Sequence, residues 1–363
     1  MASTQYKKVK PEMLLNGMFP NTDLFYIVDK HPVLLSHNCV IDVSTMDRLH
    51  KIVERGVDVF VEEETFYNLQ EQYEIISKKN QEIATKYVKT KKEMGSFLDE
   101  TQASQLIDME SVLRLLSSIE DSLSVMNPSF LLQWASYIDD MDEILQAHSV
   151  DVAILNGMIG RWLGYKKEDI SNLIIIGLLH DLGKLSMPSE ILNKPGKLTI
   201  EEFEVIKKHP IYSYELVRKS GINNPVILSG VRGHHEKASG TGYPDHLKFD
   251  EIPFFAKITS ISDIYDAMIS KRVYKAASSP LNVLENFYKE QFSDLDIRLV
   301  NIFLDKMVEA LNGKYVILSD GHMGKIVYLE KSMVTTPMVE TSKGVVLTSL
   351  DSVYIVSVFG DML

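Results

Sequence analysis

Cysteine is almost absent from this sequence of 363 residues, which contains only Cys39. A lone cysteine excludes an internal disulfide and a zinc site built from thiolates, so any bound metal must be held by nitrogen and oxygen. The sequence also lacks an apolar run of about 18 residues, the length that a membrane-spanning helix needs. Its first residues lack the apolar segment of a secretory signal. We therefore expect a cytoplasmic protein with no membrane span.

Positive charge is also scarce. The sequence has 38 Lys and Arg against 50 Asp and Glu, which gives a formal net charge of −12. Broad binding to bulk nucleic acid or to an anionic membrane needs a net positive surface, so neither is expected. A small anionic ligand remains compatible with this charge if cations gather locally.

The pattern of apolar residues predicts a mainly α fold in four segments. Residues 1–62 predict a small α+β N-terminal domain with a helix over 44–55. Residues 63–136 predict a helical linker, and residues 137–312 an all-helical domain. Residues 313–363 predict a short β-rich C-terminal segment with strands at 315–318, 326–329, 345–347 and 353–359.

Within the linker, apolar residues are spaced alternately three and four apart from Phe66 to Phe97. This spacing is a heptad seam. Asn80 lies in the seam, and a polar residue at such a position can fix the register of paired helices. Two interpretations stay open: a long helix that packs on its own protein, and a 66–97 helix that joins two chains in a homodimer.

His180 and Asp181 end an otherwise apolar helical run, and Gly183 and Lys184 follow directly. An imidazole and a carboxylate that leave water together cost several kcal/mol each unless something compensates them. A bound cation is a common compensation. The sequence therefore suggests a metalloenzyme.

Two more histidines are predicted to face inward. His148 lies on the apolar stripe of a helix, with Val152 and Leu155 following at helical spacing. His209 lies on a helix that a capping box opens at 199–202, with Phe203 and Ile206 on the same face, and Pro210 is expected to end that helix. A single inward histidine is more often a hydrogen-bonded core residue than a ligand.

The remaining candidates lie further along the chain. His234 and His235 are neighbours whose side chains diverge by about 100° on a helix, so both reach one cluster most easily at a helix end or across two metals. Asp263 lies on a narrow polar stripe with apolar residues on both sides, which predicts a buried carboxylate. Asp266 could equally cap a helix or pair with Arg272.

Taken together, seven inward-facing positions on successive helices are poorly explained as independent core residues. Histidine nitrogen with carboxylate oxygen suits iron, manganese or zinc, and an aspartate can bridge two ions about 3.5–4 Å apart. The seven positions are His148, His180, Asp181, His209, His234, His235 and Asp263.

Three stretches resemble the HD-GYP domain: HDLGK at 180–184, HHEKASGTGYP at 234–244 and SDIYDAMISKRVYK at 262–275. The resemblance covers about residues 142–290 in the expected order. This family is a branch of the HD phosphohydrolases that hydrolyses the bacterial second messenger cyclic di-GMP. The resemblance implies an all-helical HD-type catalytic domain and a cyclic di-GMP phosphodiesterase, with pGpG, or GMP after a second cleavage, as the product.

The resemblance also implies roles, position by position. One divalent metal would be held by His148, His180, Asp181 and Asp263, and Asp181 would bridge to a second metal held by His209, His234 and His235. The metals would be iron, otherwise manganese, with zinc compatible, and a metal-bridging hydroxide would be the nucleophile. Lys184 would contact the scissile phosphate, and further substrate contacts would come from Gly242, Tyr243, Pro244, Arg272 and Lys237.

Two departures from the family pattern matter. A third metal in some members uses a glutamate four residues before the first histidine, but Ile144 stands there and Glu143 lies one step off, so two metals are expected. The usual arginine and aspartate of the HHE segment are here Lys237 and Ser239. Lysine keeps the charge of arginine but loses its bidentate geometry, and serine loses the charge of aspartate. Two alternatives therefore stay open: a module that binds cyclic di-GMP or a partner protein with little turnover, and a phosphohydrolase for another nucleotide.

Overall fold

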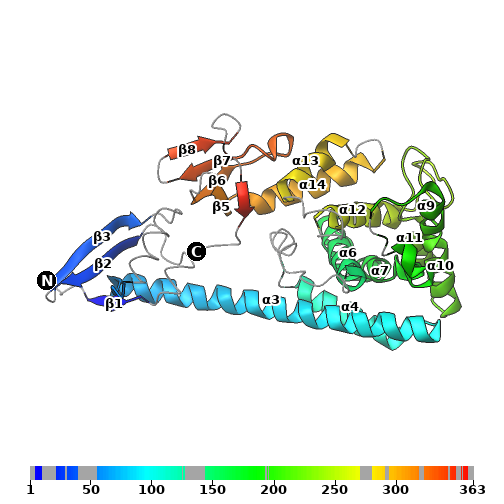
Figure 1. Ribbon diagram of the computed structural model, residues 1–363, viewed down its shortest axis with the longest axis horizontal. Coiled ribbons are helices and arrows are strands. Elements are labelled where there is room, and N and C mark those ends of the chain that lie inside the picture. Colours follow the sequence, from blue (N-terminus) through cyan, green and yellow to red (C-terminus); the bar gives the residue numbers. More distant parts are fainter. Residues whose placement is uncertain are drawn as a thin grey trace. The chain divides into compact units, whose positions relative to one another are not determined.

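The structure is a computed structural model. It describes residues 5–9, 22–28, 31–39, 55–124, 126, 144–192, 194, 196–269, 280–290, 294–318, 323–341, 344–348, 353 and 355–358. The chain divides into two compact units, Met1–Glu82 with Val308–Leu363, and Ile83–Met307. Figure 1 labels their helices and strands. The predicted helix over 44–55 lies almost entirely outside the described residues.

Two antiparallel sheets belong to the first unit. The N-terminal sheet has the order β1-β4-β2-β3, with β1 at Tyr6–Lys8, β2 at Thr22–Val28, β3 at His31–Cys39 and β4 at Phe60–Glu62. The C-terminal sheet has the order β8-β7-β6-β5-β9, with β5 at Tyr315–Leu318, β6 at Met323–Tyr328, β7 at Met338–Thr341, β8 at Gly344–Leu347 and β9 at Ile355–Val358. A short 3-10 turn, η3 (Lys331–Met333), precedes β7. The four predicted C-terminal strands are present, and β7 was not predicted.

The predicted heptad seam lies in one helix of 42 residues, α3 (Glu63–Ser104). Its later seam positions, from Ile83 to Phe97, are all at most 5% exposed. This half of the seam is therefore buried within its own chain. The seam side chains from Phe66 to Asn80 lie outside the described part, so a homodimer through α3 stays a prediction. None of the described helices combines the length and hydrophobicity that crossing a membrane requires.

The second unit is helical. It begins within α3, at Ile83, and ends within α14 (Ile297–Leu311), whose last turn belongs to the first unit. Between them lie α4 (Met109–Leu123), α6 (Ile144–Trp162), α7 (Lys167–Leu179), η2 (Leu182–Ser186), α8 (Ser189–Leu192), α9 (Ile200–Ile206), α10 (His209–Lys219), α11 (Pro225–Gly233), α12 (Phe254–Ile269) and α13 (Pro280–Glu290). The predicted mainly helical fold with a small sheet towards each end is confirmed.

The core of the helical unit is the pair α6 and α7, which lie side by side (Figure 1). Residues 173–179 of α7 are all buried, as expected of a helix that is apolar on nearly every face. Gly177 permits the close approach, since a Cβ there would lie 2.4 Å from Ala153 Cα on α6. These two helices position His148 and His180.

The prediction for Pro210 is wrong. The capping box between Thr199 and Glu202 is present as predicted and opens α9, but α9 ends at Ile206. Pro210 lies instead in the first turn of a new helix, α10, which begins at His209. Proline is tolerated there because the first amide groups of a helix have no intrahelical acceptor. His209, which the sequence placed on the helix that the capping box opens, is therefore not part of α9 and lies at the junction of α9 and α10.

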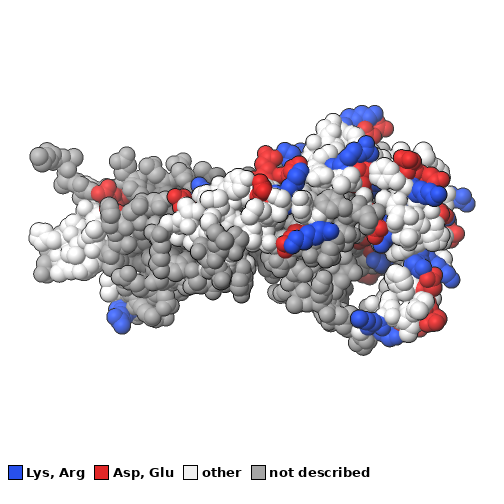
Figure 2. All heavy atoms as spheres, turned by 90° about the horizontal axis from the view of Figure 1, so that it is seen from above, with Lys and Arg blue, Asp and Glu red and all other residues white. Residues whose placement is uncertain are grey.

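Charge on the described surface is mixed. In Figure 2, Lys and Arg side chains lie beside Asp and Glu side chains over the described part of the face shown, without one large basic region. Several of the cations are paired, for example Arg232 with Asp245 at 2.6 Å and Lys194 with Glu202 at 2.6 Å. This pattern agrees with the net charge of −12.

Candidate metal centre

Three histidines at helix ends are oriented in the same way by the preceding turn. In each, ring Nδ1 donates a hydrogen bond to the carbonyl oxygen three residues earlier. The distances are 2.8 Å for His180, 2.7 Å for His209 and 2.7 Å for His234. The last carbonyls of a helix lack partners within it, so each ring satisfies one of them. Because a carbonyl only accepts, Nδ1 carries the proton, and Nε2 of the neutral ring keeps its lone pair.

His148 lies within α6 and is oriented by a carboxylate. Its Nδ1 lies 2.6 Å from Oδ2 of Asp266 on α12, and both side chains are buried. From the sequence, Asp266 could either cap a helix or form an ion pair with Arg272, and Arg272 lies outside the described residues. The signal that could have identified Asp266 is its spacing: three residues after Asp263, it lies on the same face of α12.

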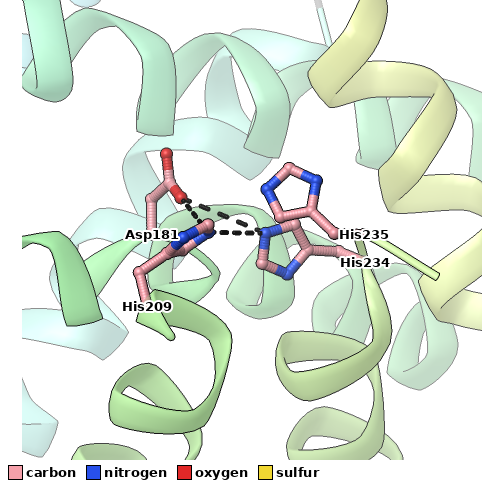
Figure 3. A group of neighbouring side chains, drawn as sticks. All are labelled: Asp181, His209, His234 and His235. Carbon is pink, nitrogen blue, oxygen red and sulfur yellow. Dashed lines mark hydrogen bonds and ion pairs between the residues drawn. The ribbon is translucent and has the colours of Figure 1, made fainter. Parts of the chain in front are cut away.

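The Nε2 atoms of these four rings surround the Asp181 carboxylate. Asp181 Oδ2 lies 3.3 Å from His148 Nε2 and 3.5 Å from His180 Nε2. Asp181 Oδ1 lies 3.1 Å from His209 Nε2 and 4.0 Å from His234 Nε2, as Figure 3 shows. Each oxygen of one carboxylate therefore faces a different pair of histidines.

Two groups of neighbouring ligand atoms result. Within each group the atoms lie within 4.8 Å of one another; the groups are Asp181, His209, His234 and His235, and His148, His180 and Asp263. Asp263 lies between them, because its Oδ1 is 3.1 Å from His148 Nε2 and its Oδ2 is 3.6 Å from His235 Nδ1. The structure thus brings together all seven positions that the sequence singled out.

Asp181 shows that these groups fit a cation. Its Oδ1 is buried and accepts no hydrogen bond, although His209 Nε2 lies only 3.1 Å away. Since His209 carries its proton on Nδ1, a nitrogen lone pair and a carboxylate oxygen face each other in a buried space. A buried acceptor without a donor costs about 1–3 kcal/mol, and more when charged. A divalent cation would turn both atoms into ligands, and the N and O donor set suits iron, manganese or zinc.

The protonation states agree with this fit. Burial lowers the pKa of His234 well below its ordinary value, and it lowers the pKa of His235 to about 3. Burial alone would raise the pKa of Asp181, but Lys184 and His180 hold it well below its usual range. Neutral imidazoles and ionised carboxylates are the forms that bind metals.

His148 differs from the other histidines. Burial alone would lower its pKa, but hydrogen bonds with Asp181, Asp263 and Asp266 raise it well above the ordinary value. In the metal-free protein this ring is therefore a cation among carboxylates. A metal ion that binds at this end of the cluster must displace a proton from His148.

Lys184 lies at the border between the cluster and solvent. It follows Asp181 in the 3-10 turn η2, and its Nζ forms an ion pair with Asp181 Oδ2. The Lys184 side chain is 20% exposed, whereas Asp181 is 1% exposed. A positive charge is thus available where an anion would approach the buried ligands.

The segment from Gly242 to Pro244 forms a tight turn beside the cluster. The ring of Tyr243 lies 4.7 Å from the ring of His235 at 34°, and Phe203 meets Tyr243 edge-on at 6.4 Å. A Cβ at Gly242 would lie 2.4 Å from the backbone nitrogen of Lys237, so no side chain fits there. The peptide bond between Tyr243 and Pro244 is cis.

Glu236 braces this turn from inside. Its buried carboxylate accepts hydrogen bonds from the backbone N–H of Asp245 at 2.6 Å and of Leu247 at 2.9 Å. Lys237 points elsewhere, with its Nζ 2.8 Å from Asp294 Oδ2. Its predicted contact with substrate therefore competes with an ion pair inside the protein.

Comparison with known proteins identifies this helical unit. Residues 132–298 match the family model described as "HD domain". This region therefore contains an HD domain, as the resemblance predicted.

Several curated relatives are similar to parts of this chain. The cyclic di-GMP phosphodiesterase response regulator RpfG of Xanthomonas campestris pv. campestris is 38% identical over 41% of this chain and 39% of that protein. A cyclic di-GMP phosphodiesterase of Thermotoga maritima is 28% identical over 82% of this chain and 77% of that protein. A 3′3′-cGAMP-specific phosphodiesterase of Vibrio cholerae is 31% identical over 44% of this chain and 31% of that protein. The match to the first and third spans less than half of their own lengths.

Proposed function

We propose that this chain is a metal-dependent phosphodiesterase that hydrolyses cyclic di-GMP to pGpG, and to GMP when the linear product is cleaved again. The observation that carries the proposal is the buried Asp181 carboxylate, which presents one oxygen to each of two histidine pairs. The names of the relatives from Xanthomonas and Thermotoga support the choice of substrate.

The proposed metal ligands follow from the two groups. His148, His180 and Asp263 would hold one ion with Asp181 Oδ2, and His209, His234 and His235 would hold the other with Asp181 Oδ1. We propose iron as the metal, otherwise manganese, with zinc compatible with the same donors. Divalent ions held by these residues would supply a water molecule of lowered pKa and positive charge to offset the charge that develops on a phosphoryl group.

The chain's own residues would supply orientation and charge. The carbonyls behind His180, His209 and His234 fix the tautomer of each ring, so that Nε2 faces the cluster without rearrangement. Lys184 would leave Asp181 for the non-bridging oxygens of the scissile phosphate, where a cation stabilises the transition state. Tyr243 would border the substrate, with its ring available beside His235 for stacking with a guanine base.

A substitution at Asp181 tests the proposal. Protein purified without oxygen and supplied with Fe²⁺ or Mn²⁺ should convert cyclic di-GMP to pGpG, measured by chromatography of the products. Asp181→Ala should abolish this conversion, because both groups lose a shared ligand. Asp121→Ala, at an exposed aspartate on α4, is the matched control and should retain wild-type activity. Full activity in Asp181→Ala would refute the proposed metal mechanism.

A second function is favoured by one observation, the ion pair of Lys237 with Asp294, which engages a cation that the resemblance assigns to substrate. A module that binds cyclic di-GMP without turnover would bind the nucleotide at micromolar protein concentration, with added metal, and release no product. The choice of substrate is tested with a panel of cyclic dinucleotides, since one relative is named as specific for 3′3′-cGAMP. Faster hydrolysis of that dinucleotide than of cyclic di-GMP would replace the proposed substrate but leave the reaction class intact.

A further inference from the structure

One residue outside the cluster holds the loop that follows the histidine pair. Asp294 lies just before α14, and residues 237–239 of the loop each donate a hydrogen bond to it. Lys237 Nζ donates to Oδ2 at 2.8 Å, Ala238 N to the backbone oxygen at 2.8 Å, and Ser239 Oγ to Oδ1 at 3.0 Å. These bonds join residues that are 55 to 57 positions apart in the sequence.

Several features distinguish this contact from an ordinary surface ion pair. The Asp294 side chain is 26% exposed, and both of its carboxylate oxygens are used. Its hydrogen bond with Lys237 holds the pKa of Asp294 below its usual range, so the carboxylate is ionised at neutral pH. A backbone hydrogen bond at Ala238 adds a contact that does not depend on long, flexible side chains.

The held loop carries a side chain that borders the cluster. Within the loop, Tyr243 N donates to the His235 carbonyl at 3.2 Å, and the Tyr243 ring lies against the His235 ring. Glu236 braces the far end of the turn through Asp245 and Leu247. Apart from the bonds to Asp294, the printed hydrogen bonds of residues 237–239 are local: Gly240 N donates to the Lys237 carbonyl at 2.8 Å, and Ser239 Oγ lies 2.8 Å from Thr241 Oγ1. Gly242 packs directly on this edge, because a Cβ there would lie 2.4 Å from Lys237 N, so we expect a displacement of the edge to reach Tyr243.

We propose that Asp294 is a positioning residue for substrate, which holds the 237–243 loop so that Tyr243 stays beside the metal cluster. The proposal rests on the proposed function, because positioning is judged by how substrate binds. Asp294 touches no predicted metal ligand, so its removal should leave the metal content of the protein unchanged.

The test begins with Asp294→Asn, which keeps the shape and removes the charge. Partly exposed charge-assisted bonds are worth little each, so we expect the KM for cyclic di-GMP to rise about 3- to 10-fold while kcat changes less than about 2-fold. Asp250→Asn, at an exposed aspartate in the neighbouring segment, is the control and should leave both values unchanged. Metal content and Tm should match wild type in both variants.

A second variant separates positioning from general damage. Ser239 Oγ lies 3.0 Å from Asp294 Oδ1, so a carboxylate at position 239 can reach the region where Lys237 now pairs. Ser239→Asp in the Asp294→Asn background should therefore return KM to within about 2-fold of wild type. In the wild-type background the same substitution places two carboxylates together and should raise KM. Absence of rescue would overturn the pairing argument.

Hydrogen exchange makes the outcome independent of turnover. In substrate-free protein, the 237–243 segment should exchange faster in Asp294→Asn than in wild type, and Ser239→Asp should reverse the change. Unchanged exchange in Asp294→Asn would overturn the proposal, as would faster exchange with a wild-type KM. An inactive wild type would count against the proposed function, and the Kd for cyclic di-GMP would then replace KM in the same comparison.

Discussion

Asp266 should control how tightly the cluster holds its metal, although it lies outside the predicted ligands. Its carboxylate accepts a 2.6 Å hydrogen bond from His148 Nδ1 in a buried setting. This bond fixes the tautomer and raises the basicity of the ring, so that Nε2 is presented to Asp181 and Asp263. We therefore predict weaker metal binding in Asp266→Asn, and weaker binding still in Asp266→Ala.

The magnitude follows from the nature of the bond. A hydrogen bond to a charged partner contributes about 1.5–3 kcal/mol, which corresponds to about 10- to 150-fold in a binding constant at 1.36 kcal/mol per factor of ten. Loss of a partner behind a ligating histidine costs about 10- to 100-fold in other sites. Asparagine can still accept from Nδ1 through its amide oxygen but lacks the charge. We expect about 10-fold weaker binding in Asp266→Asn and about 100-fold in Asp266→Ala.

The assay is titration of metal-free protein with Mn²⁺ by calorimetry, with the hydrolysis rate measured at saturating metal. Asp121→Asn, at the exposed aspartate on α4, is the control and should bind as wild type does. Excess metal should recover most of the activity of Asp266→Asn, because no ligand is lost. Wild-type Mn²⁺ affinity in both Asp266 variants would refute the reasoning.

Two further predictions address the helix junctions and pH. Gly183→Ala should abolish metal binding at the His209 group and lower Tm. A Cβ at position 183 would lie 2.0 Å from the His209 carbonyl oxygen and 2.6 Å from Ser213 N, so the start of α10 would have to move away. Elemental analysis and a melting curve check this, and a fully metallated variant would contradict it. The free energy of unfolding of metal-free protein should fall as pH drops from about 6.5 to 5, by up to about 1.4 kcal/mol per pH unit for each histidine that folding keeps neutral. Burial lowers the pKa of His180 and His234 in the folded protein, so these rings take up protons in this window only when the chain unfolds, whereas the raised pKa of His148 leaves its contribution constant below about pH 6.5. Urea titrations at several pH values should show a smaller slope in His234→Gln, and an equal slope would count against neutral buried rings.

Much of the candidate centre was predictable because the apolar residues around its side chains in the sequence predict that they are buried. His148 lies on an apolar stripe and His180 ends an apolar run, so both had to face the core. The hydrogen bonds that orient His180, His209 and His234 were harder to predict from the sequence. Each runs from ring Nδ1 to the carbonyl three residues earlier, so it depends on where the preceding helix ends. The division of the seven residues into two groups came from the family resemblance rather than from periodicity.

The misses have physical reasons. Pro210 is compatible with either side of a helix boundary, and only the turn after Ile206 decides that it begins α10. The spacing of Asp266 from Asp263 indicates a shared helix face, but its partner His148 lies 118 residues away on another helix, so the pair itself could not be predicted from a local pattern. Strand β7, Met338–Thr341, has only two apolar residues and is too short for alternation to show. Asp294 likewise acts across the fold, through residues 55 to 57 positions earlier.

A count of bound metal tests the central claim most directly. Wild-type protein and Asp181→Ala, purified side by side without oxygen, would be analysed for iron, manganese and zinc per chain. We predict about two divalent ions per chain in wild type and a loss of both ions, or of all but a weakly held one, in Asp181→Ala. Wild-type protein that hydrolyses cyclic di-GMP without bound metal, or an Asp181→Ala variant that keeps two ions, would contradict it.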